Sequence, residues 1–187
     1  LAMATQPAGG KTGDVLSTQP AVKLIDADGN LVTNDSSTVI SAEVVGVRTL
    51  VAGQPAPIDG VLINSSDNLL GSTPTQTAAS GVARFSGLRV KGAPGNTYAI
   101  QFTATLNGNS VPVTSSDLIF TANDAAAISI TTQPVGGVNG ELLATAPVVS
   151  LTDRFGYPMV NDSTTYVSAS ITSGSNGSLS GITTAQA

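Results

Sequence analysis

The stretch Thr5-Gln6-Pro7-Ala8-Gly9-Gly10 recurs 127 residues later as Thr132-Gln133-Pro134-Val135-Gly136-Gly137. When this offset is kept without gaps, 19 of the first 44 residues are identical to their counterparts. The identities include Asn34-Asp35-Ser36, which meets Asn161-Asp162-Ser163, and continue as far as Ser41-Ala42, which meets Ser168-Ala169. A solenoid repeat is only about 20–50 residues long, so a period of this length predicts that each copy is a whole domain.

Inside each copy the pattern is that of short β-strands. Apolar and polar residues alternate over short runs, and Gly, Pro, Asn or Asp stands at the junctions between them. The predicted strands of the first copy are Val22–Asp26, Val39–Val45, Val61–Ile63, Val82–Phe85, Tyr98–Ala104 and Leu118–Thr121. No segment keeps apolar residues at the spacing of a helix face. We therefore predict an all-β fold in which each domain is a β-sandwich.

The repeat predicts two domains, the second one incomplete. The first covers residues 1–126 and carries an inserted loop at about 49–77, which is shorter in the second copy. The second covers residues 127–187 and holds only the first half of a sandwich. We expect its missing strands to come from a longer parent chain, since the start at Leu1 is typical of a mature or excised fragment. Strand donation by a neighbouring chain is the alternative, but no spare donor strand precedes the first domain.

Composition excludes several classes of function. Only 10% of the 187 residues are charged, against about 25% in an ordinary domain. The formal net charge of −5 leaves no basic surface for nucleic acid. With no Cys and no His, the chain has neither disulfides nor a Ser-His or Cys-His nucleophile pair. Oxygen ligands remain, which suit calcium or magnesium. No apolar run approaches the length of a membrane span, so we expect no membrane insertion.

Several stretches resemble bacterial Ig-like domains of the invasin/intimin type found in surface proteins. In the first copy Asp26-Ala27-Asp28-Gly29-Asn30-Leu31-Val32 resembles the early part of these domains, and Gly81–Phe85 and Gly95–Ile100 resemble their later strands. The second copy departs from the pattern at Phe155 and Tyr157. The resemblance implies tandem immunoglobulin-like domains on a cell surface, in an adhesin stalk, a fibre or a surface layer, without catalytic residues.

The first calcium candidate is the turn of Asp26, Asp28 and Asn30. Its oxygen spacing is that of the start of a calcium loop, but Ser37 stands where the loop needs a bidentate acid. The alternative is a hairpin turn in which Gly29 adopts the left-handed conformation. Calcium is therefore a possible ligand here and not a required one.

The second calcium candidate is the pair Asn123 and Asp124 at the junction between the copies. Joints between tandem extracellular domains are often stiffened by calcium, and further ligands could come from Asp35, Asp162 and Glu141. The alternative is a solvated linker.

Two other patterns carry weaker hypotheses. Asn34, Asn64, Asn161 and Asn176 stand in Asn-x-Ser triplets, which the 44 serine and threonine residues make common by composition. A glycosidase would need two acids flanking one cleft, yet Glu occurs once per copy, at Glu43 and Glu141. Glu43 is predicted on the solvent face of its strand.

These observations predict a non-catalytic structural or adhesive segment of an extracellular bacterial protein. Its expected partners are neighbouring copies or further repeats, and a cell-surface glycan or protein. Low charge and abundant hydroxyls favour close packing with like chains. The alternative is a carbohydrate-binding or spacer module of a secreted enzyme, with stacking rings at Phe85, Tyr98, Phe155 or Tyr157.

Overall fold

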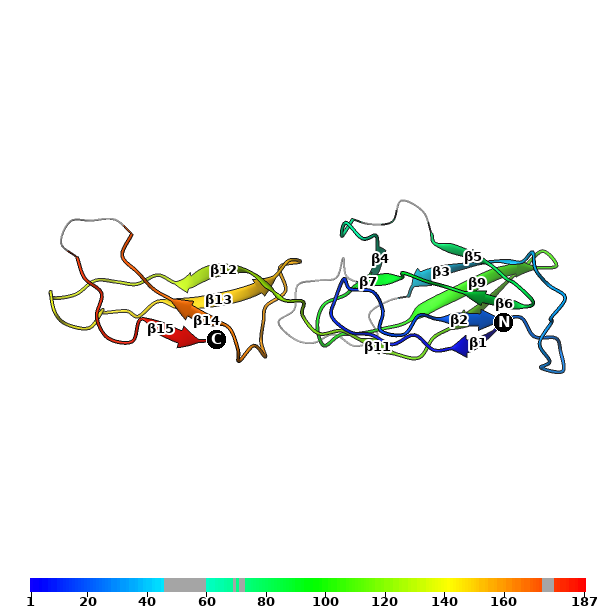
Figure 1. The fold of residues 1–187 in the computed structure, drawn as a ribbon, viewed down its shortest axis with the longest axis horizontal. Coiled ribbons are helices and arrows are strands. Elements are labelled where there is room, and N and C mark those ends of the chain that lie inside the picture. Colours follow the sequence, from blue (N-terminus) through cyan, green and yellow to red (C-terminus); the bar gives the residue numbers. More distant parts are fainter. Residues whose placement is uncertain (46–59, 69, 71–72, 173–176) are drawn as a thin grey trace. The chain divides into compact units, whose positions relative to one another are not determined.

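The computed structural model describes residues 1–45, 60–68, 70, 73–172 and 177–187 (Figure 1). The chain divides into two compact units, Leu1–Asn123 and Asp124–Ala187, three residues before the boundary predicted between residues 126 and 127. Within the described ranges the chain forms strands and turns and has no helix, as the all-β prediction requires. Part of the predicted insertion, residues 49–59, 69 and 71–72, lies outside the described residues.

The first unit is built from two larger antiparallel sheets and two short strand pairs. One sheet has the order β1-β2-β6, formed by Ala2–Thr5, Ala21–Lys23 and Val82–Arg84. The other has the order β10-β9-β3-β5, formed by Asn109–Thr114, Ile100–Leu106, Val39–Val44 and Thr75–Thr77. The short pairs are β4 (Val61–Ile63) with β7 (Arg89–Lys91), and β8 (Thr97–Tyr98) with β11 (Leu118–Ile119).

One apolar core lies between these sheets. The inward residues of β9 are Ile100, Phe102 and Ala104, which alternate with less buried positions as a half-buried strand requires. The ring of Phe85, just after β6, lies 5.1 Å from that of Phe102, so the aromatic contact joins the two sheets. Val22 of β2 has no exposed surface. The alternation read from the sequence therefore packs as predicted.

The strand β10 was not among the predicted strands. Asn107 and Gly108 both have positive φ, 52° and 79°, and form a two-residue loop between the paired Leu106 and Asn109. An Asn-Gly pair is the common signal for this hairpin turn. Pro112 is tolerated because β10 is the edge strand of its sheet.

The second unit repeats the opening pairings of the first at the same offset. β12 (Ala125–Thr132) pairs with β13 (Val148–Asp153) as β1 pairs with β2: Met3 faces Val22, and Ile130 faces Val149. The register shift that follows Met3 recurs after Ile130.

The last strand pair of the second unit also has a counterpart. β14 (Tyr166–Ser168) pairs with β15 (Thr184–Gln186), as β3 pairs with β5 in the first unit. The N–H of Ala78 donates to the Thr38 carbonyl at 2.8 Å, and the N–H of Ala187 donates to the Thr165 carbonyl at the same distance. β15 therefore occupies the position of β5.

Gly9 and Gly136 offer a matched test of these equivalent positions. A Cβ built on Gly9 would lie 2.3 Å from the carbonyl oxygen of Ile119, whereas one built on Gly136 would meet nothing within 4 Å. We expect Gly9→Ala to lower the unfolding free energy of the first unit by about 1–3 kcal/mol, because backbone must shift. Gly136→Ala should cost less than about 0.5 kcal/mol. Urea unfolding followed by circular dichroism, together with residue-resolved hydrogen exchange, measures the loss of unfolding free energy in each variant. Equal losses would contradict the close backbone packing at Gly9 and the open space at Gly136.

Candidate functional site

The Asp26 turn follows β2 and is held by its own carboxylate. Asp26 Oδ1 accepts hydrogen bonds from the N–H groups of Asp28 at 3.0 Å and Asn30 at 2.8 Å. Asp26 Oδ2 accepts from Asn30 Nδ2 at 3.2 Å. The N–H of Asn30, together with its side-chain amide, lowers the pKa of Asp26. The three predicted ligands thus share one loop, and both oxygens of its first carboxylate already accept protein donors.

The second unit keeps this turn with different side chains. Asp153 Oδ1 accepts from the N–H groups of Phe155 at 2.9 Å and Tyr157 at 3.0 Å, the counterparts of the Asp28 and Asn30 bonds. The Asp26 side chain is exposed, whereas Asp153 is only 2% exposed. The Phe155 and Tyr157 rings lie 6.4 Å apart, and the Arg154 guanidinium lies 4.7 Å from the Phe155 ring centre. Bonds to main-chain N–H groups therefore preserve the turn while its side chains change.

Three of the four aromatic residues considered as sugar platforms are buried. Tyr98 is fully buried, and its hydroxyl accepts from the Ala93 N–H at 2.7 Å. Phe85 belongs to the core, and Tyr157 is 2% exposed. A stacking ring must reach the ligand, so the prediction is wrong for these three residues. Phe155 is half-buried, with Arg154 against its face.

A second carboxylate turn occurs in both units. Asp35 Oδ1 accepts from the N–H groups of Ser37 and Thr38, and its Oδ2 accepts from the Thr38 hydroxyl at 2.7 Å. Asp162 makes the corresponding bonds to Thr164 and Thr165. The threonine hydroxyl is the first cause, and the N–H donors the next, of the lowered pKa of both carboxyls. These two acids, proposed as calcium ligands, build turns.

Asn123 belongs to the first unit and not to a solvated linker. It is 5% exposed, and its Nδ2 donates to the Thr12 carbonyl at 2.8 Å and to Asp14 Oδ1 at 2.9 Å. Asp124 is the first residue of the second unit. The solvated-linker alternative is therefore wrong for Asn123, which ties the end of the first unit to its N-terminal loop.

The N-terminal loop and the C-terminal segment of the first unit also pair directly. Thr12 N–H donates to the Thr121 carbonyl at 2.8 Å, and Thr121 N–H donates to the Gly10 carbonyl at 2.9 Å. Lys11 and Thr121 form a parallel bridge. The Gln6 side chain accepts from the Ser116 N–H at 2.9 Å. We call the paired residues 10–12 and 121, together with Asn123, the terminal clamp.

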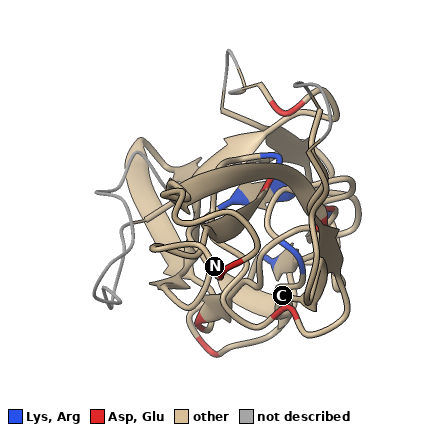
Figure 2. Cartoon of the chain, turned by 90° about the vertical axis from the view of Figure 1, so that its left-hand side faces the viewer, with Lys and Arg blue, Asp and Glu red and all other residues tan. Residues whose placement is uncertain are grey.

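The remaining charged residues are sparse (Figure 2). Among the described residues no group of three or more His, Cys, Asp or Glu is placed to hold a metal ion. Glu43 is exposed on β3, as predicted, and Glu141 lies in the other unit.

A separate finding concerns membranes. Among the residues that the structure describes, no helix is long and apolar enough to cross a membrane.

The Asn-x-Ser residues lie in or beside turns. Asn34 and Asn161 are exposed, each directly before a carboxylate turn. Asn64 Oδ1 accepts from the N–H groups of Ser66 and Asn68, so its side chain organises a turn as well. Asn176 lies outside the described residues.

Comparison of the chain with family models, curated proteins and solved structures found no match in any of the three.

The lowered pKa values predict acid sensitivity of the carboxylate turns. A carboxyl with a depressed pKa in the folded state stabilises that state above its unfolded pKa, near 3.8, and the contribution is lost as pH falls toward the folded value. The variants Asp35→Asn and Asp162→Asn keep an acceptor oxygen but lose the charge. We expect both to reduce the drop in urea midpoint between about pH 7 and about pH 3.

The matched control is Asp28→Asn, because the Asp28 carboxylate accepts none of these turn bonds. It removes one charge and should leave the pH dependence close to that of the unmodified chain. An equal reduction in all three variants would assign the acid sensitivity to net charge and contradict the turn mechanism.

Proposed function

We propose that this chain is a non-catalytic, load-bearing segment of an extracellular bacterial surface, fibre or surface-layer protein, built from Ig-like β-sandwich units in series. The terminal clamp is the observation that carries the proposal. Residues 10–12, which follow β1, run parallel to the segment at Thr121 close to the C-terminal end of the unit, and hydrogen bonds join the two segments. Tension applied to the two ends therefore loads these bonds together, in shear, instead of opening them one after another.

The recurrence of the opening pairings supports a series of related units. The two strand pairs of the second unit keep the registers of their counterparts, and two carboxylate turns recur with the same acceptors. A duplicated scaffold of this kind supplies length and spacing. The resemblance to Ig-like domains of bacterial surface proteins points to the same role.

The distribution of polar groups supports a structural role as well. Asp26, Asp35, Asp153 and Asp162 all accept main-chain hydrogen bonds inside their own turns. Asn123 is used in the clamp. These side chains are committed to holding the backbone, and neighbouring copies are the partners that a low-charge, hydroxyl-rich surface suits best.

Single-molecule force spectroscopy of the full chain tests the load-bearing role. Thr121→Pro removes the N–H that donates to the Gly10 carbonyl, and Asn123→Ala removes the side-chain bonds to Thr12 and Asp14. We expect both to lower the unfolding force of the first unit, Thr121→Pro more strongly. If the Thr121→Pro variant fails to fold, the unfolding force of the milder Asn123→Ala variant still tests the proposal.

The control is Leu24→Ala, which opens the core beside β2 without touching the clamp. Leu24 is 4% exposed, so the substitution should cost about 2–5 kcal/mol of unfolding free energy at equilibrium. Its unfolding force should nevertheless stay nearer that of the unmodified chain. If the clamp variants keep full force while Leu24→Ala loses it, the load-bearing proposal is wrong. An antibody against the first unit that labels intact producing cells tests the surface location.

A further inference from the structure

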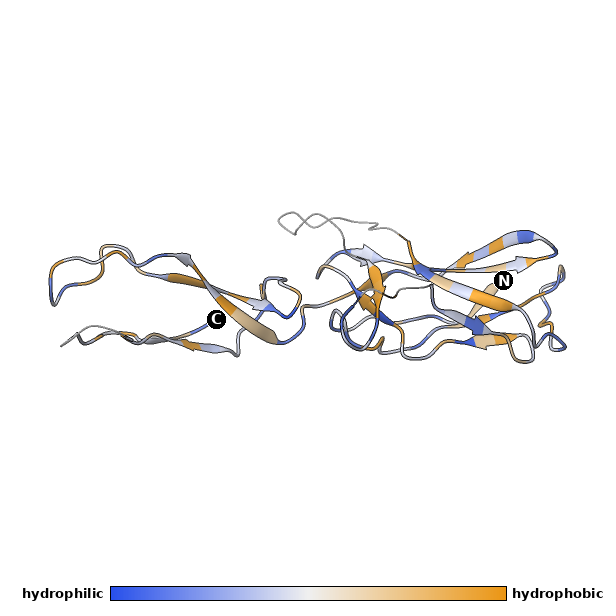
Figure 3. Cartoon of the chain, turned by 90° about the horizontal axis from the view of Figure 1, so that it is seen from above, coloured by the Kyte–Doolittle hydropathy of each residue, from blue (hydrophilic) through white to orange (hydrophobic). Residues whose placement is uncertain are grey.

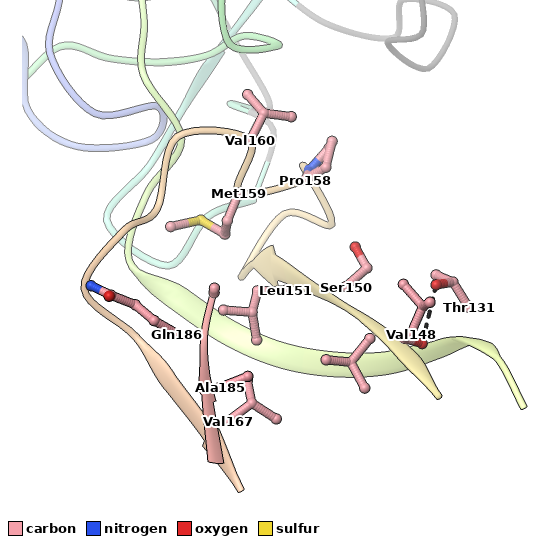
Figure 4. A pocket seen from close by; sticks show the side chains of 12 residues that line it. Thr131, Val148, Ser150, Leu151, Pro158, Met159, Val160, Val167, Ala185 and Gln186 are labelled. Carbon is pink, nitrogen blue, oxygen red and sulfur yellow. Dashed lines mark hydrogen bonds between the residues drawn. The ribbon is translucent and has the colours of Figure 1, made fainter. Parts of the chain in front are cut away.

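The second unit has an open, largely apolar hollow of about 420 Å³ between its two strand pairs (Figure 4). Val149, Leu151, Met159 and Val167 are among its lining residues. Leu151, Val167 and Ala185 gather in the hollow, and the strands around it carry hydrophobic stretches (Figures 3 and 4). Val149 is 38% exposed, although its counterpart Val22 is fully buried. The inner face of this unit is therefore open.

The first unit shows what covers the same face there. β6 pairs with the free edge of β2, placing Ala83 opposite Val22. β9 pairs with the free edge of β3, placing Ala104 opposite Ile40. In the described part of the second unit, β13 and β14, the counterparts of β2 and β3, each pair with a single strand. Two strand edges and the hollow between them are thus open together.

Loop residues of the second unit are likewise exposed where their counterparts in the first unit are covered. Leu16 is 4% exposed, and its N–H donates to the Leu88 carbonyl at 3.0 Å. Its counterpart Leu143 is 43% exposed. The space beside Gly136 is empty where the Ile119 carbonyl closely approaches Gly9. All these missing contacts come from one continuous stretch of the first unit, residues 79–121.

We infer that the open face of the second unit binds a polypeptide with the strand pattern of residues 79–121. One of its strands lies antiparallel to β13 and places a small residue, the counterpart of Ala83, opposite Val149. Another lies antiparallel to β14 and places the counterpart of Ala104 opposite Val167. A ring in the position of Phe102 fills the hollow.

The chemistry of the face selects a polypeptide as its occupant. Two strand edges present main-chain donors and acceptors that an added antiparallel strand satisfies. The lining between them is largely apolar, which does not suit a glycan. A second copy of this chain is not the occupant, because its own β6 and β9 are already paired within its first unit.

Two glycines set the register of the complex. In the first unit a Cβ on Gly81 would lie 2.3 Å from the Val32 carbonyl oxygen, so the bound polypeptide needs glycine where it passes Met159, the counterpart of Val32. On the other side, Gly136 must stay free of a side chain for the β11-like strand to pass. The inference extends beyond the proposed mechanical role and does not depend on it.

The test adds a synthetic polypeptide of residues 79–121 to the full chain and follows amide hydrogen exchange by NMR. The Leu24 N–H donates to the Gly81 carbonyl at 2.8 Å, so the Leu151 N–H is the matching reporter. We expect its exchange to slow by at least about tenfold at saturation. Unchanged exchange at Leu151 with the polypeptide in solution and in excess would overturn the inference.

Glycine variants test the register. Gly136→Ala in the chain, or Gly81→Ala in the polypeptide, should weaken the protection at least about tenfold. Gly87→Ala is the matched control, because Gly87 also has positive φ, 69° against 76° for Gly81, but has nothing within 4 Å of its Cβ position. If Gly81→Ala and Gly87→Ala bind equally, the inferred register is wrong.

A fused variant keeps the test decisive if the free polypeptide precipitates. Residues 79–121 are joined directly after Ala187, because the Ala187 N–H is bonded as the Ala78 N–H is. We expect the Leu151 amide to become protected and Gly136→Ala to abolish that protection. An unprotected Leu151 in the fused chain would overturn the inference.

Discussion

Each main-chain N–H and C=O that a sheet removes from water needs a partner, and both units are organised around this requirement. The chain has no disulfide and few charges to hold it otherwise. In the first unit, side chains supply hydrogen-bond partners for main-chain groups beyond the strands. Gln19 spans two segments, donating to the Leu16 and Leu88 carbonyls and accepting from the Leu88 N–H at 2.9 Å. Thr12 Oγ1 accepts from the Gly92 N–H at 2.9 Å.

The two copies show which features of a turn are required by the backbone. Asp26 and Asp153 are identical and accept equivalent bonds, whereas the residues that donate to them differ completely in character. Donation uses the main-chain N–H, which every residue except proline has. A turn around the exposed Asp26 and a turn around the buried Asp153 therefore have the same pattern of hydrogen bonds.

The sequence predicted the all-β fold and most strands of the first unit, because period-two alternation and turn residues are local signals. It did not predict β5, β7 or β10, although the Asn107-Gly108 pair is the usual signal for the hairpin turn before β10. It assigned Tyr98 a possible surface role because one chain segment does not reveal what packs on it from another. Aspartate spacing could not separate a calcium loop from a self-bonded turn, since both place oxygens at the same intervals. Only the N–H donors around Asp26 and Asp35 show how these oxygens are used.

In the first unit the opening strand pairs contact residues 79–121, and the second unit presents the same face to the inferred polypeptide. Sequence differences between the two copies show which contacts on this face have changed. Gln19 and Thr12, which bond to Leu88 and Gly92, have Ala146 and Asn139 as their counterparts. An alanine cannot make the three bonds of Gln19, so a polypeptide lying against Ala146 must satisfy its own backbone there by other means. The strand edges, by contrast, offer main-chain groups that are independent of side-chain identity. The bound polypeptide therefore pairs with β13 and β14 in the register in which β6 and β9 pair with β2 and β3. The loop contacts made by Gln19 and Thr12 in the first unit have no equivalent side chains in the second.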